Sequence, residues 1–111
     1  MPFPLDHYIE ASHVDYKERL EEKKPRSWLK SVSAFANTEG GHLIFGVKNE
    51  PREGVGLENP QAVVSRLTEL IKVRIDPTPR YRVREVEIEG KSCVDLEVQD
   101  GPAYPYYYAF D

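Results

Sequence analysis

The sequence has one cysteine and no apolar run long enough to cross a membrane. A single cysteine, Cys93, excludes an internal disulfide framework and a cysteine-rich zinc site. The longest apolar run, residues 43–45, is far shorter than the roughly 20 residues that a membrane-spanning helix needs. A basic leader followed by an apolar segment is also lacking. We therefore expect a cytoplasmic protein with no membrane partner.

Motifs for nucleotide and metal binding are lacking as well. There is no G-x-x-x-x-G-K-[ST] loop to hold a triphosphate, and the glycines form no G-x-G-x-x-G turn between a strand and a helix. The three histidines, His7, His13 and His42, do not have the short spacing typical of metal ligands. No base is predicted beside Cys93. We expect no resident cofactor and no cysteine nucleophile.

The composition predicts one globular domain over residues 1–111. Hydrophobic residues make up 40% of the 111 residues, and the formal net charge is −4. This acidic balance disfavours nucleic-acid binding by the chain as a whole. However, residues 72–84 carry five basic side chains against Asp76 alone. Because solvent screens charges beyond about 8–10 Å, such a cluster can still form a local positive surface.

The hydrophobic pattern predicts two helices and four strands. Pro25 suits a first helical turn, and an apolar stripe of helical period follows up to Asn37 and the Gly40-Gly41 pair. Asn59 and Pro60 indicate the start of a second helix. Residues 13–20, 42–47, 81–88 and 93–98 have the character of strands. The order β-α-β-α-β-β predicts an α/β (α+β) fold with a mixed sheet.

Three local features refine this prediction. On the first strand, Val14, Tyr16 and Leu20 are expected to share the inner face. On the third strand the apolar phase shifts between Val83 and Val86, which predicts a β-bulge near residues 84–85. The chain ends in an aromatic run, residues 103–108. That abrupt ending predicts the N-terminal part of a longer protein with further C-terminal domains.

A small group of charged residues on the first strand has catalytic potential. Asp15 and Lys17 leave one face of the strand about 6–7 Å apart, and Glu10 lies just upstream. Two carboxylates and a lysine can hold a divalent ion and steady a phosphodiester during cleavage. A solvated strand face is the alternative interpretation, and the spacing alone does not separate the two.

Longer motifs resemble those of the Schlafen/AlbA-type (Schlafen AlbA_2) DNA-binding domain, also labelled "divergent AAA-4". They are Glu10-x4-Asp15-Tyr16-Lys17, the segment S-A-F-A-N-T-E-G-G-H-L-I-F-G-V over residues 33–47, and Gly54-Val55-Gly56-Leu57. The resemblance extends from Glu10 to about Pro105. It implies an Alba-like fold and a DNA-binding module of a transcriptional regulator.

The same resemblance implies a second possibility, a metal-dependent nuclease. Some Schlafen proteins are RNases with an acidic trio, whose first two members correspond to Glu10 and Asp15. Where the family often has acids after Gly46-Val47, this chain has Lys48-Asn49. Because two ligands bind a divalent ion poorly, nuclease activity with Mg²⁺ or Mn²⁺ is the alternative rather than the main prediction.

We predict that basic residues from two segments contact the phosphate backbone. One group lies on the first strand and its exit, and the other alternates along the third strand: Lys17, Arg19, Lys23, Lys24 and Arg26, then Arg80, Arg82 and Arg84. Such contacts position a protein without reading sequence, and we favour DNA over RNA. The tyrosine-rich end can stack on bases or pair as a sheet edge. Edge pairing makes a non-catalytic homodimerisation module the third alternative.

Overall fold

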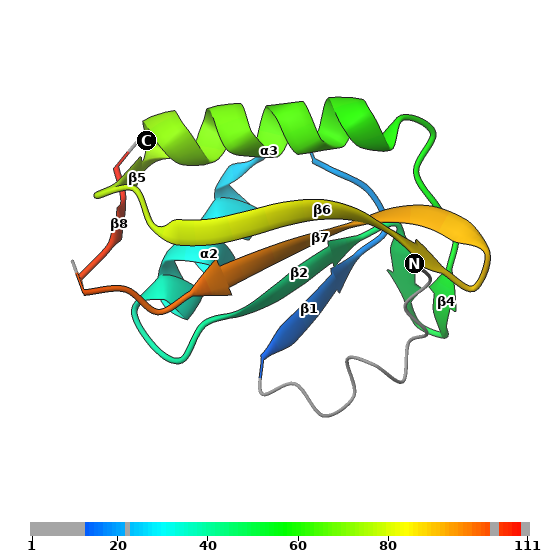
Figure 1. Ribbon diagram of the computed structural model, residues 1–111, viewed down its shortest axis with the longest axis horizontal. Coiled ribbons are helices and arrows are strands. Elements are labelled where there is room, and N and C mark those ends of the chain that lie inside the picture. The colour runs from blue at the N-terminus through cyan, green and yellow to red at the C-terminus, as the bar shows by residue number, and fades with distance from the viewer. Residues whose placement is uncertain (1–12, 22, 103–104, 110–111) are drawn as a thin grey trace.

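A computed structural model describes residues 13–21, 23–102 and 105–109 (Figure 1). The predicted site residue Glu10 lies outside these ranges. The elements are, in chain order, β1 (Val14–Lys17), α2 (Arg26–Ala36), β2 (Gly41–Phe45), β3 (Val47–Asn49), β4 (Arg52–Gly54), α3 (Pro60–Arg74), β5 (Ile75–Asp76), β6 (Arg80–Ile88), β7 (Lys91–Gln99) and β8 (Tyr107–Tyr108).

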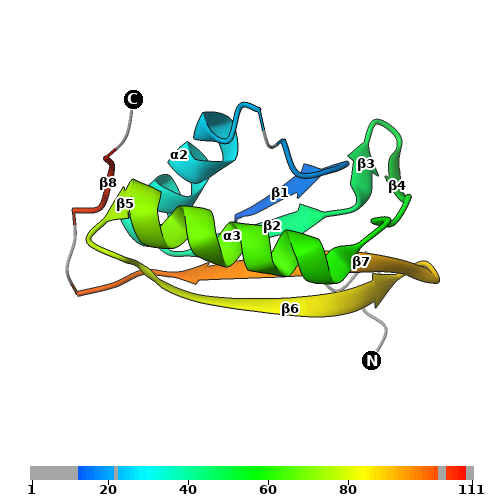
Figure 2. The same cartoon turned by 90° about the horizontal axis from the view of Figure 1, so that it is seen from above.

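Four strands form the main sheet, in the order β1-β2-β7-β6. β1 pairs with β2 in parallel, whereas β7 is antiparallel to both of its neighbours. Both helices lie on the same side of this sheet (Figure 2). The predicted mixed sheet with two helices is confirmed. Two short strand pairs, β3-β4 and β5-β8, form separate two-stranded sheets.

The helices begin and end where the sequence predicts. α2 follows Pro25 and is closed by Asn37, whose backbone N–H donates to Ser33. At the start of α3, the side chain of Asn59 accepts a hydrogen bond from the backbone N–H of Ala62 at 3.2 Å. This cap satisfies one of the free donors at the helix start. The apolar stripes of both helices face the sheet, as amphipathic periodicity requires.

The main hydrophobic core lies between the helices and the sheet. The buried members of this core are Trp28, Leu29, Val32, Ala36, Leu43, Phe45, Leu67, Leu70, Ile71, Ile75, Val94, Leu96, Val98 and Tyr106. A second, smaller cluster lies on the opposite face of the sheet and contains Tyr16, Ile44, Val47, Val86, Ile88 and Cys93. β2 therefore contributes to both clusters and is buried on both faces.

The predicted β-bulge in β6 is wrong. The register between β6 and β7 is continuous from Arg80 opposite Gln99 to Ile88 opposite Lys91. The apolar phase shifts because the two ends of the strand bury opposite faces. Tyr81 and Val83 pack against the main core, whereas Val86 and Ile88 belong to the second cluster.

The expected inner face of the first strand is also corrected. β1 ends at Lys17, so Leu20 lies beyond it and packs against the main core. Val14 and Tyr16 instead pack in the second cluster. Since Asp15 pairs in parallel with Leu43, its side chain leaves the sheet on the helix side. The two faces of β1 are thus exchanged relative to the prediction.

The C-terminal segment is attached to α2 by a pair of hydrogen bonds. The Asn37 Nδ2 donates to the backbone oxygen of Tyr106 at 2.8 Å, and the Tyr106 backbone N–H donates to Asn37 Oδ1 at 2.6 Å. Tyr106 is buried in the main core. The backbone of Ala109 then donates to the oxygen of Arg74 at 2.8 Å. These contacts fix β8 beside α2.

We expect Asn37→Ala to lower the free energy of unfolding by about 2 kcal/mol, because two partly buried hydrogen bonds are lost at about 1 kcal/mol each. The measurement is urea denaturation followed by circular dichroism. Thr38→Ala serves as the control, since the Thr38 hydroxyl donates to carbonyls of the preceding α2 and not to the C-terminal segment in the described residues. An equal loss in both variants would contradict a role for Asn37 in holding Tyr106.

Candidate nucleic-acid interface

The basic residues around the β1-α2 connection converge on one hollow. Lys17, Arg19, Lys23 and Lys24 all line it, together with Ser27 and the two acids Glu18 and Glu21. Four of the five residues predicted in this segment therefore lie together. β1 ends at Lys17 and α2 begins at Arg26, so side chains from both ends of this connection line the same hollow.

A second hollow adjoins the first and is more strongly basic. The two share Lys23, Lys24 and Ser27, and the second is also lined by Arg26, Lys30, Arg74, Pro25 and Tyr108. No acidic side chain among the described residues lines this second hollow. We call the basic residues of the two hollows the α2 basic surface: Lys17, Arg19, Lys23, Lys24, Arg26, Lys30 and Arg74.

The start of α2 adds to the positive potential of this surface. Pro25 stands at the N-cap position and makes no side-chain cap bond, and the first turn contains no acidic residue. The N-terminal end of a helix carries a partial positive charge because its first N–H groups have no partner within the helix. The dipole of α2 therefore reinforces the lysines and arginines around it.

The β6 arginines lie elsewhere. Arg80, Arg82 and Arg84 do share one face of β6, as predicted, because the register is unbroken. This is the face of the second cluster, opposite the helices. The two groups of basic residues that were predicted to contact phosphates therefore do not lie on one surface. Arg82 also lies opposite Glu97, and Arg84 opposite Asp95.

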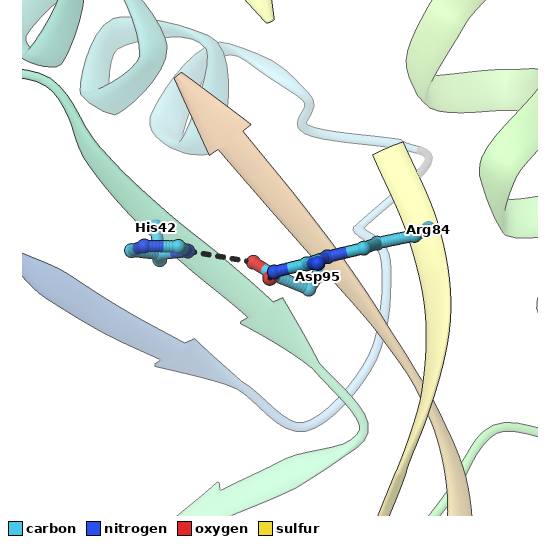
Figure 3. Close-up of polar contacts among 3 residues, drawn as sticks. All are labelled: His42, Arg84 and Asp95. Carbon is cyan, nitrogen blue, oxygen red and sulfur yellow. Dashed lines mark hydrogen bonds and ion pairs between the residues drawn. The ribbon is translucent and has the colours of Figure 1, made fainter. Parts of the chain in front are cut away.

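Arg84 is part of a bridge that spans three strands (Figure 3). Its Nη2 donates to Asp95 Oδ2 at 3.1 Å, and His42 Nδ1 lies 2.9 Å from Asp95 Oδ1. Since a carboxylate only accepts, the imidazole donates this bond. Asp95 is fully buried, whereas the side chains of His42 and Arg84 are 19% and 38% exposed. The bridge ties β2, β7 and β6 together.

The hydrogen bond to Asp95 raises the pKa of His42 above its ordinary value, and burial opposes this shift. The charges of Asp95 and Glu97 raise the pKa further, whereas that of Arg84 lowers it. Cys93, on the same face, is buried. Burial raises the pKa of its thiol, which disfavours the reactive thiolate.

Of the possible nuclease residues, the structure places two. Lys17 Nζ lies 3.4 Å from Asp15 Oδ2, and both side chains are partly exposed. Glu10 lies outside the described residues. Among the residues that the structure describes, no group of three histidine, cysteine or acidic side chains is placed to hold a metal ion. Nuclease activity stays a prediction.

Two members of the α2 basic surface were missed by sequence reasoning. Lys30 follows Arg26 by four residues, and helical spacing places such residues on one face, so this signal was available. Arg74 ends α3, yet it lines the second hollow beside residues of α2. No local pattern reports such a long-range contact. The same is true of the Asp95 bridge, because Asp95 alternates with the apolar positions of β7 like a solvent-facing residue.

The fold and the basic surface define a small α+β module with a mixed sheet, two helices on one face and a cationic end. The sequence pattern of the Schlafen, AlbA_2 family matches residues 10–111. The chain therefore belongs to the Schlafen AlbA_2 domain family.

Two solved structures share the fold. The NMR structure of the N-terminal domain of a RecG-related protein from Nitrosomonas europaea, named for an ATP-dependent DNA helicase, superposes with a TM-score of 0.74 at 24% identity, covering 93% of this chain and 74% of that one. A crystal structure of the DIP2311 protein from Corynebacterium diphtheriae has a TM-score of 0.55 at 22% identity, covering 91% of this chain and 20% of that one. These similarities show the fold alone.

One curated relative is a protein of Ureaplasma parvum named as an uncharacterised ATP-binding protein. It is 36% identical over 50 residues, which is 45% of this chain and 14% of the relative. The matched segment is thus a small part of a much longer protein. None of the helices in the described residues is both long and apolar enough to span a membrane.

Proposed function

We propose that this domain binds nucleic acid, DNA in preference to RNA, by contacting phosphates with the α2 basic surface. In this role it serves as the nucleic-acid-binding module of a regulator. Contacts of lysine and arginine with phosphates supply sequence-independent affinity and depend strongly on salt. We therefore expect weak, salt-sensitive binding that reads little sequence.

The observation that carries this proposal is the convergence of seven basic side chains on two adjoining hollows of a chain whose net charge is −4. Acidic residues outnumber basic residues in the whole chain. A random share of the surface would therefore carry at least as many acidic as basic side chains, which this surface does not. The second hollow, with five cations and no acid among its described lining residues, is its strongest part. Membership of the Schlafen AlbA_2 family supports the same role.

Replacing Lys23 and Lys24 together by alanine tests the proposal, because both residues line both hollows and are exposed. We expect the affinity for a labelled DNA oligonucleotide to fall about tenfold at about 50 mM salt. The slope of log K against log salt should also become shallower by about 1.5. The measurement is fluorescence anisotropy in EDTA, which prevents metal-dependent cleavage.

The matched control is Arg80→Ala combined with Arg82→Ala, which removes the same charge from two exposed residues on the opposite face of the sheet. We expect this control to bind within about twofold of the parent chain. A loss in the control alone would assign binding to the β6 arginines instead. No binding by the parent chain at low salt would refute the proposed function.

A further inference from the structure

Tyrosines of the C-terminal segment adjoin the α2 basic surface. A third hollow is lined by Tyr106, Tyr107 and Tyr108 along with residues of α2, and it shares Arg26, Lys30 and Tyr108 with the strongly basic second hollow. The Arg26 guanidinium lies 5.9 Å from the ring centroid of Tyr108. Cationic and aromatic side chains therefore follow one another along a continuous stretch of surface.

Tyr107 is the aromatic side chain of this stretch that is open to a partner. It is 61% exposed, whereas Tyr106 is buried. Its backbone is held on both sides, by the bonds between Asn37 and Tyr106 and by the pairing of β8 with β5. A ring on a fixed backbone loses little conformational freedom when a flat partner stacks on it.

Asp76, the acid beside Tyr107, favours contact with a base over contact with a phosphate at this position. Asp76 lies directly opposite Tyr107 in the β5-β8 pair, so both side chains leave on the same face. A carboxylate repels a phosphate but accepts hydrogen bonds from base amino groups. Phosphates are thus favoured beside Arg26 and Lys30, and a base is favoured on Tyr107.

From this arrangement we infer that the preferred ligand is single-stranded nucleic acid, with a base stacked on Tyr107 and the neighbouring phosphates on the α2 basic surface. The inference rests on the proposed function. In a duplex, base faces are covered by neighbouring base pairs and are not available to a tyrosine ring. A single strand exposes them, and stacking of a base on an aromatic side chain is sequence-tolerant.

The test compares Tyr107→Ala with Tyr107→Phe in the 111-residue chain. The probes are a mixed-sequence DNA strand of about 12 nucleotides, its duplex, and the RNA strand of the same sequence. We expect Tyr107→Ala to weaken binding of the DNA strand about tenfold and leave duplex binding within twofold. Tyr107→Phe, which keeps the ring, should bind like the parent chain. The RNA strand shows whether stacking extends to ribose-containing ligands.

Each outcome bears on a different claim. If the Lys23 and Lys24 variant loses affinity but Tyr107→Ala does not, single-strand stacking is refuted and the proposed function stands. If none of the three probes binds, both are refuted. If Tyr107→Ala changes only the sedimentation of the free protein, β8 is an edge for pairing with a second copy, and the inference is wrong. Unchanged thermal unfolding in both variants confirms that the fold is intact.

Discussion

Replacing Asp95 with asparagine should lower the free energy of unfolding by about 2–3 kcal/mol. The carboxylate is fully buried and accepts hydrogen bonds from both His42 and Arg84. Asparagine keeps the shape, but its amide nitrogen presents a donor where an acceptor is needed, and the negative charge between two basic groups is lost. Breaking a fully buried ion pair costs about 3–5 kcal/mol. We expect less here because Arg84 is 38% exposed and can turn toward water.

The same substitution should flatten the pH dependence of stability. The folded-state pKa of His42 is raised above its unfolded value of about 6.5. The protonated form therefore stabilises the fold fully below the unfolded pKa, and this contribution is lost as pH rises through the folded pKa. As the pH rises from the unfolded pKa of His42 through its folded pKa, the free energy of unfolding of the parent chain should fall more than that of Asp95→Asn. Urea denaturation between about pH 5.5 and pH 8.5 measures the difference.

Glu97→Gln is the matched control, because Glu97 lies two residues further along β7 on the same face and loses the same charge. We expect it to change the free energy of unfolding by less than about 0.5 kcal/mol. It should also keep most of the pH dependence, since Asp95 supplies the main cause of the His42 shift. Equal losses in the two variants would show that general charge, and not the bridge, stabilises the sheet.

Gly40→Ala is expected to cost about 3 kcal/mol. Gly40 has a φ of +82°, and a Cβ built there would lie 2.6 Å from the backbone oxygen of Val98. The left-handed conformation costs a residue with a Cβ about 1–2 kcal/mol. The close contact adds a further cost, because β7 must move to relieve it. Thermal unfolding followed by circular dichroism measures the loss.

Gly90→Ala separates these two causes. Gly90 also has a positive φ, +77°, but a Cβ there would meet nothing within 4 Å. It should therefore cost about 1–2 kcal/mol, from the conformation alone. If both glycine variants lose the same stability, the approach of Gly40 to β7 contributes nothing and the packing argument is wrong.

The helices and their caps were predictable because their signals are local. Asn59 and Pro60 define the start of α3, and the Gly40-Gly41 pair follows the end of α2. Such signals act through hydrogen bonds and backbone conformations of residues that are close in the sequence. The positions of the four main strands along the chain were also predictable, from their apolar patterns. Which face of each strand is buried was not predictable. β1 buries the face turned away from the helices, whereas β6 buries the helix side at its start and the other side at its end. A period-two pattern states which residues share a face, but not what covers it.

Sequence alone determined the order of the two helices and the four main strands, the family, and the N-terminal members of the α2 basic surface. These depend on neighbouring residues and on a long continuous motif. Tertiary structure decided which cations meet. It brought Arg74 to Lys23 and Lys24, sent the β6 arginines to the other face, and engaged Arg84 with Asp95. The physical reason is that charge acts over a few ångströms of space, and residues far apart in the chain are brought that close only by packing.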